Sequence, residues 1–395
     1  MRYRKSLFCG LVLLLTFTWV GCENLRYYNQ AINGQYQILT SKRSINKVLA
    51  DDKTPAEVKQ KLRFIVDIRN YAQKNLNLPV NGQYQQYADV HRRFVVWNVY
   101  AADEFSLEPK SWTFPIVGKA TYRGYFSEKA ARGYGEKLKK EGYDVHVSGI
   151  EAYSTVGWFR DPILNTFIHN SEIDLAETLF HELAHQTAFA KGDTDFNEAF
   201  ATAVAEEGLR RWMMSTTNAQ AEAGFRASLQ RKDAFIHLVI NGRRQLENLY
   251  QKQASASTQV ASLTMVPAIT TDMKRQRKQE IIAGLRDDYA KVKAAWGGNP
   301  EYDNWFSKPI NNAKLNTVAT YYELVPRFNR LLEKCNGDLP KFYAEVRKMA
   351  KLSKEERASI LAKFGPVAAS EKHRGGIVGI GSGIAQPIES RIAEK

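Results

Sequence analysis

The sequence has few cysteines, and its main N-terminal apolar run is too short to span a membrane comfortably. Three cysteines occur in 395 residues, which does not fit the dense disulfide framework of small secreted domains. The run from Leu7 to Val20 is shorter than the roughly 20 residues that a membrane-spanning helix needs. It follows a cationic stretch, residues 2–5, and ends at Gly21-Cys22, as in a signal peptide. We therefore expect residues 1–21 to be removed on export.

The end of this run resembles a bacterial lipobox: Thr18-Trp19-Val20-Gly21-Cys22. The resemblance implies cleavage before Cys22 and lipidation of its thiol; the alternative is that Cys22 merely lies near an ordinary cleavage site. With Cys9 removed and Cys22 lipidated, Cys335 remains alone, which excludes an internal disulfide and a cysteine-ligated metal. Glu23 replaces the aspartate associated with inner-membrane retention. The expected location is therefore the cell envelope, lipid-anchored and facing the periplasm, with the outer membrane favoured over the inner.

Negative charge is scarce as well. The chain has 42 acidic against 56 basic residues, a formal net charge of +14. In a cytosolic protein this would suggest nucleic acid, but export argues against that partner. Anionic lipid headgroups or cell-wall polymers are alternatives, and a generally basic, solvated surface is the simplest explanation. We expect contact with the membrane through the N-terminal lipid and no nucleic-acid partner.

The first half of the mature chain combines helix and strand signals. Thr54-Pro55-Ala56-Glu57 matches a capping box with proline at the first helical position, and an apolar stripe continues to Pro79. A second helix should run from Ser127 to about Lys140 and end at Gly142. Aromatic and β-branched segments separated by Pro, Gly and Ser predict strands in a single small sheet. These segments are 94–100, 112–117, 121–126, 144–148, 153–159 and 163–168.

From Ser171 onward the periodicity is helical. Ser171-Glu172-Ile173-Asp174 resembles a capping box, a polar turn occupies 191–194, and a second helix runs from about Phe196 past Arg211. Later helices are expected at 225–253, 274–296, 316–334 and 339–364, with a loop at 254–271. The predicted fold is α+β and mainly α. Its parts are 22–170 (N-terminal helices and small mixed sheet), 171–215 (zinc-binding helix pair), 216–364 (helical C-terminal region) and 365–395 (flexible tail).

The string His181-Glu182-Leu183-Ala184-His185 is an HExxH motif. On a helix, residues four apart share one face, so both imidazoles can bind one zinc ion while Glu182 lies beside the open coordination position. Zinc in catalytic sites has three protein ligands, and the neighbouring carboxylate serves as the general base. The alternative is an ordinary histidine pair on a surface helix.

The third ligand should lie downstream, and Glu198 is the best candidate. Asn197-Glu198-Ala199-Phe200-Ala201 resembles the N-E-x-F-A string that supplies the zinc glutamate in gluzincins such as the alanyl aminopeptidases. Asp193, Asp195 and Glu206 are alternative ligands, and Asp195 with Glu198 also has the spacing of a capping box. The resemblance further implies that Thr202 orients a histidine ligand, although simple helix packing explains it equally well.

A wider resemblance covers most of the chain up to about residue 360. The strings Tyr122 to Phe126, Ala152 to Phe159, Asp161-Pro162 and His181 to Ala201, with Asn311-Asn312-Ala313 and Thr320-Tyr321, are similar to a bacterial family labelled as putative aminopeptidases. Members typically open with a lipoprotein signal. The resemblance implies a zincin-like (gluzincin) fold with a small β-sheet before the HExxH helix, one zinc ion, and a peptide or protein substrate.

Further candidates surround the motif. Residues 153–159 could pair with an extended substrate as an edge strand, or be an ordinary strand. Candidate donors to the developing oxyanion are Tyr153, His169, Tyr321 and Tyr322, each of which also has a structural explanation. The G-x-M-E-N segment that binds the substrate amine in alanyl aminopeptidases is missing, and Glu151 could replace its glutamate. The four remaining histidines, His91, His146, His237 and His373, have no ligand-spaced neighbour.

The expected function is zinc-dependent hydrolysis of peptide bonds in the cell envelope, by an aminopeptidase or an endopeptidase. Glu182 is the expected catalytic base, which activates water at the zinc ion and later protonates the leaving amine. One alternative is a non-catalytic, zinc-stabilised lipoprotein that binds cell wall or protein. Another is hydrolysis of a non-peptide amide.

Overall fold

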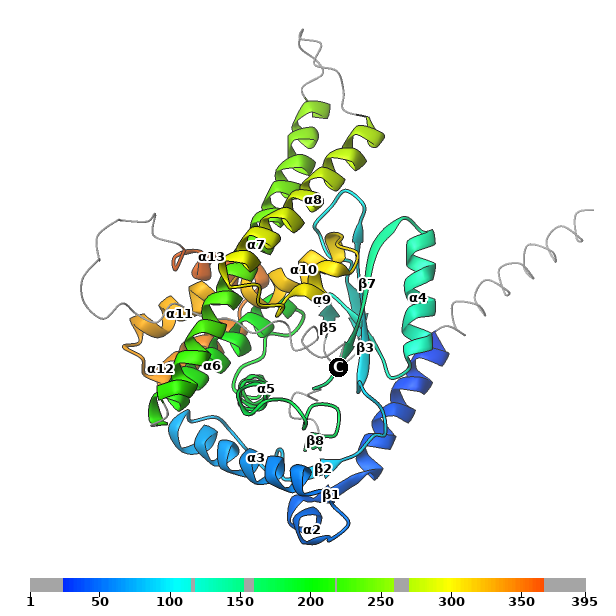
Figure 1. Cartoon of the computed structure of the whole chain (residues 1–395). Helices are drawn as coiled ribbons and strands as arrows, with labels where there is room; N and C mark the ends of the chain where they lie inside the picture. The colour runs from blue at the N-terminus through cyan, green and yellow to red at the C-terminus, as the bar shows by residue number, and fades with distance from the viewer. Residues whose placement is uncertain (1–23, 115–117, 153–159, 217–218, 259–269, 366–395) are drawn as a thin grey trace, which may run out of the picture.

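A computed structural model describes residues 24–114, 118–152, 160–216, 219–258 and 270–365 (Figure 1). Within these ranges the chain is mainly helical, with three small sheets, which confirms the predicted α+β class. No helix among these residues is long and apolar enough to cross a bilayer. The predicted signal peptide, Cys22, residues 153–159 and most of the predicted tail lie outside the described residues.

The N-terminal part contains a helix that the sequence did not predict, over residues 24–40. It is followed by β1 (Lys42–Ser44), α2 (Ile45–Ala50) and α3 (Ala56–Asn75). The predicted capping box at the start of α3 is wrong. Pro55 occupies the N-cap position, and it has no side-chain oxygen to accept a hydrogen bond.

The largest sheet has β3 (Val96–Asp103) at its centre, paired antiparallel with β6 (Arg123–Tyr125) and β7 (Tyr143–Ile150). Helix α4 (Glu128–Lys140) packs on one side, and Val99 and Ala101 of β3 share a small apolar core with it. Helix α10 (Asn312–Tyr322) contacts the same two strands, β3 and β7, from the other side (Figure 1). Successive side chains of a strand point to opposite faces of the sheet, so β3 can contact α4 on one face and α10 on the other.

Two further sheets replace the single sheet that was predicted. β2 (Gln86–Ala88) pairs antiparallel with β1 and parallel with β8 (Ile163–Leu164), and β4 (Trp112–Phe114) pairs with β5 (Gly118–Ala120). The predicted strand at 163–168 stops at Leu164 because the chain turns there, with the Phe167 N–H donating to the Leu164 carbonyl at 3.4 Å.

The C-terminal half is a set of helices, two pairs of which were predicted as single helices. α10 is separated from α11 (Val325–Lys334), whose first turn contains Pro326, and proline cannot continue a preceding helix. α12 (Leu339–Ala350) is separated from α13 (Lys354–Ala362) by a new capping box between Ser353 and Glu356. The remaining helices are α5 (Glu172–Ala184), α6 (Thr194–Ser215), α7 (Ala219–Thr258), α8 (Thr271–Ala295) and α9 (Asp303–Ser307).

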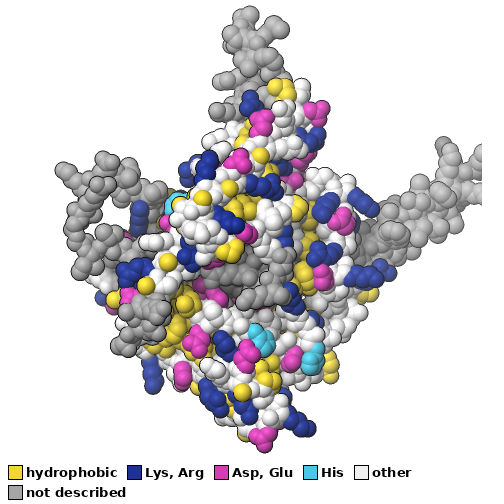
Figure 2. Space-filling model, viewed as in Figure 1, with side chains coloured by type: hydrophobic (Ala, Val, Ile, Leu, Met, Phe, Trp, Pro, Cys, Tyr) yellow, Lys and Arg dark blue, Asp and Glu magenta, His cyan; other side chains and the backbone are white. Residues whose placement is uncertain are grey.

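Helices α7 and α8 form a long antiparallel pair that projects from the body of the molecule (Figure 1). The loop predicted from residue 254 is wrong at its start, because α7 continues to Thr258. On the face in Figure 2, lysine and arginine side chains are dispersed, with acidic side chains among them. That distribution agrees with a generally basic, solvated surface.

Candidate metal centre

Helix α5 carries the HExxH motif through the interior of the molecule. Its N-terminus is fixed as predicted, with the Ser171 hydroxyl accepting the Asp174 N–H at 3.1 Å. Leu175, Leu179 and Leu183 are buried. His181 and His185 are only 5% and 8% exposed. An ordinary histidine pair on a surface helix is therefore excluded.

A short connection then returns the chain to the same site. Asn197 closes it: its side chain accepts the Ala190 N–H at 2.7 Å and donates to the Ala190 carbonyl at 2.9 Å. The N-cap of α6 is Asp193, which accepts the Phe196 N–H, so the capping box predicted for Asp195 and Glu198 is wrong. Glu198 instead lies on the second turn of α6, on a rigid helical segment.

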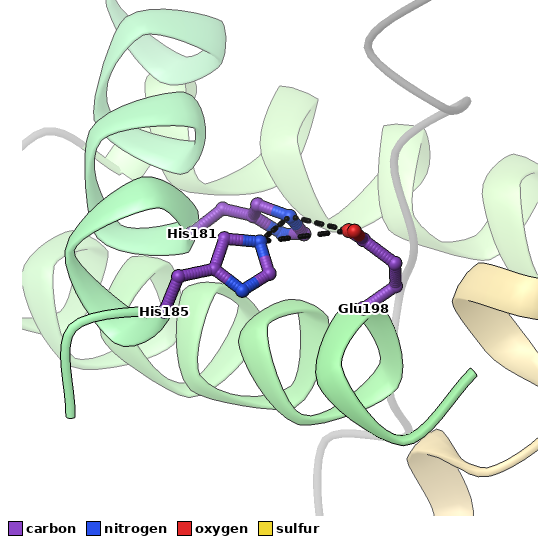
Figure 3. Close-up of side chains that lie close together, drawn as sticks. All are labelled: His181, His185 and Glu198. Carbon is purple, nitrogen blue, oxygen red and sulfur yellow. Dashed lines mark hydrogen bonds and ion pairs between the residues drawn. The ribbon is translucent and has the colours of Figure 1, made fainter. Parts of the chain in front are cut away.

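His181, His185 and Glu198 point toward one another from α5 and α6 (Figure 3). His181 Nε2 lies 3.2 Å from Glu198 Oε2 and 3.2 Å from His185 Nε2, and His185 Nε2 lies 3.6 Å from Glu198 Oε2. The three donor atoms therefore form a nearly equilateral triangle.

The size of this triangle fits a zinc ion. Ligand bonds of 2.0 to 2.1 Å at the tetrahedral angle place neighbouring donor atoms roughly 3.3 Å apart. Two imidazole nitrogens and one carboxylate oxygen also form a standard donor set for catalytic zinc. The residues could hold a metal ion of this kind without rearrangement.

Electrostatics favours a cation at the same point. Burial opposes the charged form of Glu198, but the two histidines outweigh it and hold the pKa of its carboxyl well below the usual range. Burial likewise disfavours a charged His185, yet the Glu198 carboxylate raises its pKa overall. Glu182 has a raised pKa because of burial, opposed by both histidines and reinforced by Glu198 and Asp161. A carboxyl group of raised pKa is suited to accepting a proton near neutral pH.

The alternative ligands have other roles. Asp193 caps α6 and accepts a hydrogen bond from Arg357 Nε at 2.9 Å, with both side chains buried. Asp195 accepts a hydrogen bond from the Thr320 hydroxyl at 2.9 Å. Glu206 lies two further turns along α6, and its neighbours include Lys232 and Glu177. None of the three joins the triangle of donor atoms within the described part of the chain.

Loss of the Arg357–Asp193 pair is expected to destabilise the fold without removing the metal. Arg357→Met should lower the free energy of unfolding by about 3 kcal/mol, because it leaves a buried carboxylate without its partner. Lys354→Met is the matched control, since the exposed Lys354 ammonium is 4.0 Å from Asp193 and should cost less than about 0.5 kcal/mol. Urea denaturation measures both. Equal stability of the two variants would contradict this assignment.

Glu206 should make stability depend on pH. Burial raises the pKa of its carboxyl to about 8; Lys232 opposes this and two acidic neighbours add to it. The unfolded chain releases this proton near pH 4.5, so its stabilising contribution is complete below that pH and is lost by about pH 8. The free energy of unfolding should fall by on the order of 5 kcal/mol across this window. Glu206→Gln should flatten the dependence of the free energy of unfolding on pH, whereas the exposed control Glu355→Gln should not. The same pH dependence in the wild type and both variants would show that Glu206 does not cause it.

The candidate oxyanion donors lie in different places. The Tyr321 ring is 6.0 Å from the His181 ring, so Tyr321 borders the centre, and Tyr322 beside it is buried. His169 precedes α5, whose first residue, Glu172, lies roughly 13 Å along the helix from His181. The exposed His169 ring is 3.5 Å from Glu57. Tyr153 lies outside the described residues.

Other predicted candidates have structural surroundings. Thr202 is buried on α6, one turn beyond Glu198, and no hydrogen bond joins it to a histidine among the described side chains. Glu151 accepts a hydrogen bond from Asn170 at 3.2 Å, at the end of α5 opposite the HExxH motif. His146 is half-buried, and desolvation, with Lys314 and Lys308 nearby, lowers its pKa to about 3. His91 and His237 are exposed, and His373 lies outside the described residues.

Two residues beside Glu182 were not predicted as site residues from the sequence. Asp161 is buried, and its charge acts on Glu182. The Tyr84 N–H donates to the Asp161 carbonyl at 2.9 Å, and the buried Tyr84 hydroxyl has no hydrogen-bond partner in the described structure. Burial, Glu182 and Asp161 together raise the pKa of this phenol well above 10. Tyr84 therefore keeps its proton beside the Glu182 carboxyl.

Comparison with known proteins identifies a family for the chain. A family model described as "Putative aminopeptidase" matches residues 26–361, which include all three donor residues and the helices that hold them. No curated protein and no solved structure matches the chain. Because the family match spans well over half of its length, the chain belongs to the "Putative aminopeptidase" family.

Proposed function

We propose that this protein is a zinc-dependent, gluzincin-like peptidase of the cell envelope, with His181, His185 and Glu198 as the zinc ligands. The observation that carries the proposal is the buried triangle of donor atoms, which has the dimensions of a tetrahedral zinc site. Membership of the "Putative aminopeptidase" family supports peptide-bond hydrolysis as the reaction. Cleavage at the peptide N-terminus is the form of this activity that the family name suggests.

The surrounding residues have distinct roles in this proposal. When bound, zinc would act as a Lewis acid that polarises the peptide carbonyl and increases the acidity of water. Glu182 takes a proton onto its carboxylate and later gives it to the leaving amine. Tyr321, whose ring borders His181, supplies a hydroxyl that can donate to the developing oxyanion. Burial of the site strengthens each of these polar contacts.

The proposed location rests on the N-terminal sequence. The apolar run up to Val20 and the lipobox-like string ending at Cys22 support export and a lipid anchor. A short tether would place the catalytic domain at the membrane, facing the periplasm.

Cleavage of a peptide library by the zinc-loaded protein tests the proposed function. We expect cleavage that stops on treatment with a chelator and returns when zinc is added. Mass spectrometry of the products shows whether single residues leave from the N-terminus or internal bonds are cut. Stoichiometric zinc without cleavage of any peptide would instead support a non-catalytic, zinc-stabilised lipoprotein.

A further inference from the structure

A cleft of about 840 Å³ lies beside His185, at the C-terminal end of the motif helix. This volume is typical of sites that hold small ligands or short peptide segments. Its described lining includes four basic side chains and no acidic one: Arg160, Arg347, Lys348 and Lys351. We call it the basic cleft.

Most of this positive charge is not neutralised by neighbouring residues. Lys348 pairs with Glu345 at 2.6 Å. Arg160, Arg347 and Lys351 have no ion-pair partner in the described part of the chain. Cations in the last turn of α12 also complement the helix dipole, which accounts for Arg347 and Lys348. It does not account for Arg160, which comes from a distant segment.

The same cleft contains buried polar atoms without partners. His185 Nδ1, Gln186 Nε2 and the Thr187 hydroxyl are buried, and none has a hydrogen-bond partner among the described residues. Buried polar atoms in folded proteins are normally paired. With a metal on Nε2, Nδ1 of His185 carries a proton, so all three groups can donate. Three donors and three cations without ion-pair partners, all from residues that line one cleft, match a carboxylate ligand.

We propose that the basic cleft binds a carboxylate of the substrate, so that the enzyme prefers acidic peptides. This inference rests on the proposed peptidase function and names its substrate class. The carboxylate belongs to an Asp or Glu side chain or to the peptide C-terminus. The positive charge of the cleft would repel a free α-amine, so the N-terminus of the substrate binds outside the basic cleft.

Binding to the zinc-loaded Glu182→Gln protein tests this without turnover. Three peptides separate the sources of the carboxylate: neutral Ala-Ala-Gln-Ala amide, Ala-Ala-Glu-Ala amide, and Ala-Ala-Ala-Ala with a free C-terminus. Calorimetry should give at least tenfold tighter binding for one or both carboxylate peptides than for the neutral amide. Arg347→Gln/Lys351→Gln should remove this preference. Lys341→Gln, an exposed cation on the same helix outside the cleft, should keep it.

The outcomes separate this inference from the proposed function. Equal binding of all three peptides, or a preference that survives Arg347→Gln/Lys351→Gln, overturns the inference even if the wild type cleaves peptides. A preference that depends on Arg347 and Lys351 supports it even if the wild type cleaves nothing, in which case the peptidase function fails.

An independent observation concerns the helix of residues 24–40, which has two apolar faces. The inner face packs on the body: Ile38 is buried, the Tyr27 ring contacts the Tyr125 ring, and Gly34 lies so close to the Phe126 ring that no side chain would fit. The outer face is an exposed stripe, which we call the N-terminal stripe. It consists of Leu25, Tyr28, Ile32, Tyr36 and Leu39, which are 36 to 71% exposed.

The N-terminal stripe is too concentrated to be scattered surface hydrophobicity. Its five positions fall within about 80° of the helix circumference. They include five of the eight large apolar side chains that are exposed in the described ranges. Contiguous exposed apolar surface of this kind marks an interaction site.

We infer that the N-terminal stripe lies in the headgroup region of a lipid bilayer. Three features favour this occupant over another protein. The first described residue of the helix lies two positions after Cys22 in the sequence, and the apolar run 7–20 lies just before that cysteine. Two of the five side chains are tyrosines, which are enriched at membrane interfaces. Helices with an apolar face bind in the plane of the interface and stabilise a lipid anchor that is marginal alone.

Thiol accessibility in isolated bacterial envelopes tests this with the full chain. In a Cys335→Ser background, Ile32→Cys should react with a membrane-impermeant maleimide at least tenfold more slowly than the exposed neighbour Asn33→Cys. Detergent should abolish the difference, and mass spectrometry locates the label. Equal rates in envelopes would overturn the inference. Slow labelling of Ile32→Cys that persists in detergent, together with cross-linked dimers, would assign the stripe to a second copy of the chain.

Discussion

Replacement of Glu182 by glutamine is expected to lower peptide turnover about 10³-fold while zinc stays bound. Glutamine keeps the size of the side chain but cannot accept the proton, and general acid–base catalysis contributes 10²- to 10⁴-fold. Glu182 is not one of the three donor atoms of the triangle, so the metal content should remain one ion per chain. Single-turnover kinetics with metal analysis on the same sample measures both quantities.

Glu172→Gln is the matched control for this prediction. Glu172 is an exposed residue in the first turn of the same helix, so its replacement should leave turnover unchanged. Unchanged turnover in Glu182→Gln would refute the proposed mechanism. Loss of zinc in that variant would instead show that Glu182 binds the metal.

Replacement of Glu198 by glutamine is expected to weaken zinc binding by at least about 100-fold. Substitution of groups that merely support a metal ligand already costs 10- to 100-fold, and glutamine also removes the negative charge from the triangle. The increase in melting temperature that zinc gives the wild type should then disappear, because a ligand stabilises the fold only in proportion to its occupancy. Competitive titration with a zinc chelator and thermal unfolding measure the two effects.

Asp195→Asn is the control for Glu198→Gln. Asp195 lies on the same helix and was an alternative ligand, but its carboxylate accepts a hydrogen bond from Thr320. We expect its zinc affinity to stay within a few-fold of the wild type. If Glu198→Gln kept zinc and Asp195→Asn lost it, Asp195 and not Glu198 would be the zinc ligand.

The candidate metal centre was largely predictable because its geometry is local. His181 and His185 share a face of α5 by helical spacing alone, and Glu198 follows from the short connection and the resemblance of residues 197–201 to gluzincins. Tyr84 and Asp161 could not be predicted in the same way. Their position beside Glu182 depends on contacts between segments about a hundred residues and about twenty residues from the motif, which no local pattern encodes.

The fold was predictable to a similar degree. The capped starts at Ser127 and Ser171 are confirmed, because a hydroxyl that accepts a backbone N–H is a local device. The helix of residues 24–40 was not predicted because apolar residues lie on two of its faces, so the sequence does not show one apolar stripe at helical spacing. The breaks before α11 and α13 had local signals in Pro326 and in the Ser353–Glu356 capping box, which the wider helical periodicity concealed.

Asn311 and Asn312 show how a recognisable string can be structural. The Asn312 side chain donates to the carbonyls of Asp103, Glu104 and Ser106 at 2.9 to 3.0 Å, and the Asn311 side chain donates to the Val145 carbonyl at 2.9 Å. These bonds fix α10 to the largest sheet. Since Tyr321 lies on α10, the asparagines also hold its ring beside His181.

The position of bound zinc tests the account most directly. Crystals of the zinc-loaded protein, measured at the zinc absorption edge, should show one anomalous peak about 2.0 to 2.2 Å from His181 Nε2, His185 Nε2 and a Glu198 carboxylate oxygen. A crystal of zinc-loaded protein without a peak at this triangle, or with its zinc held by other residues, would contradict the account.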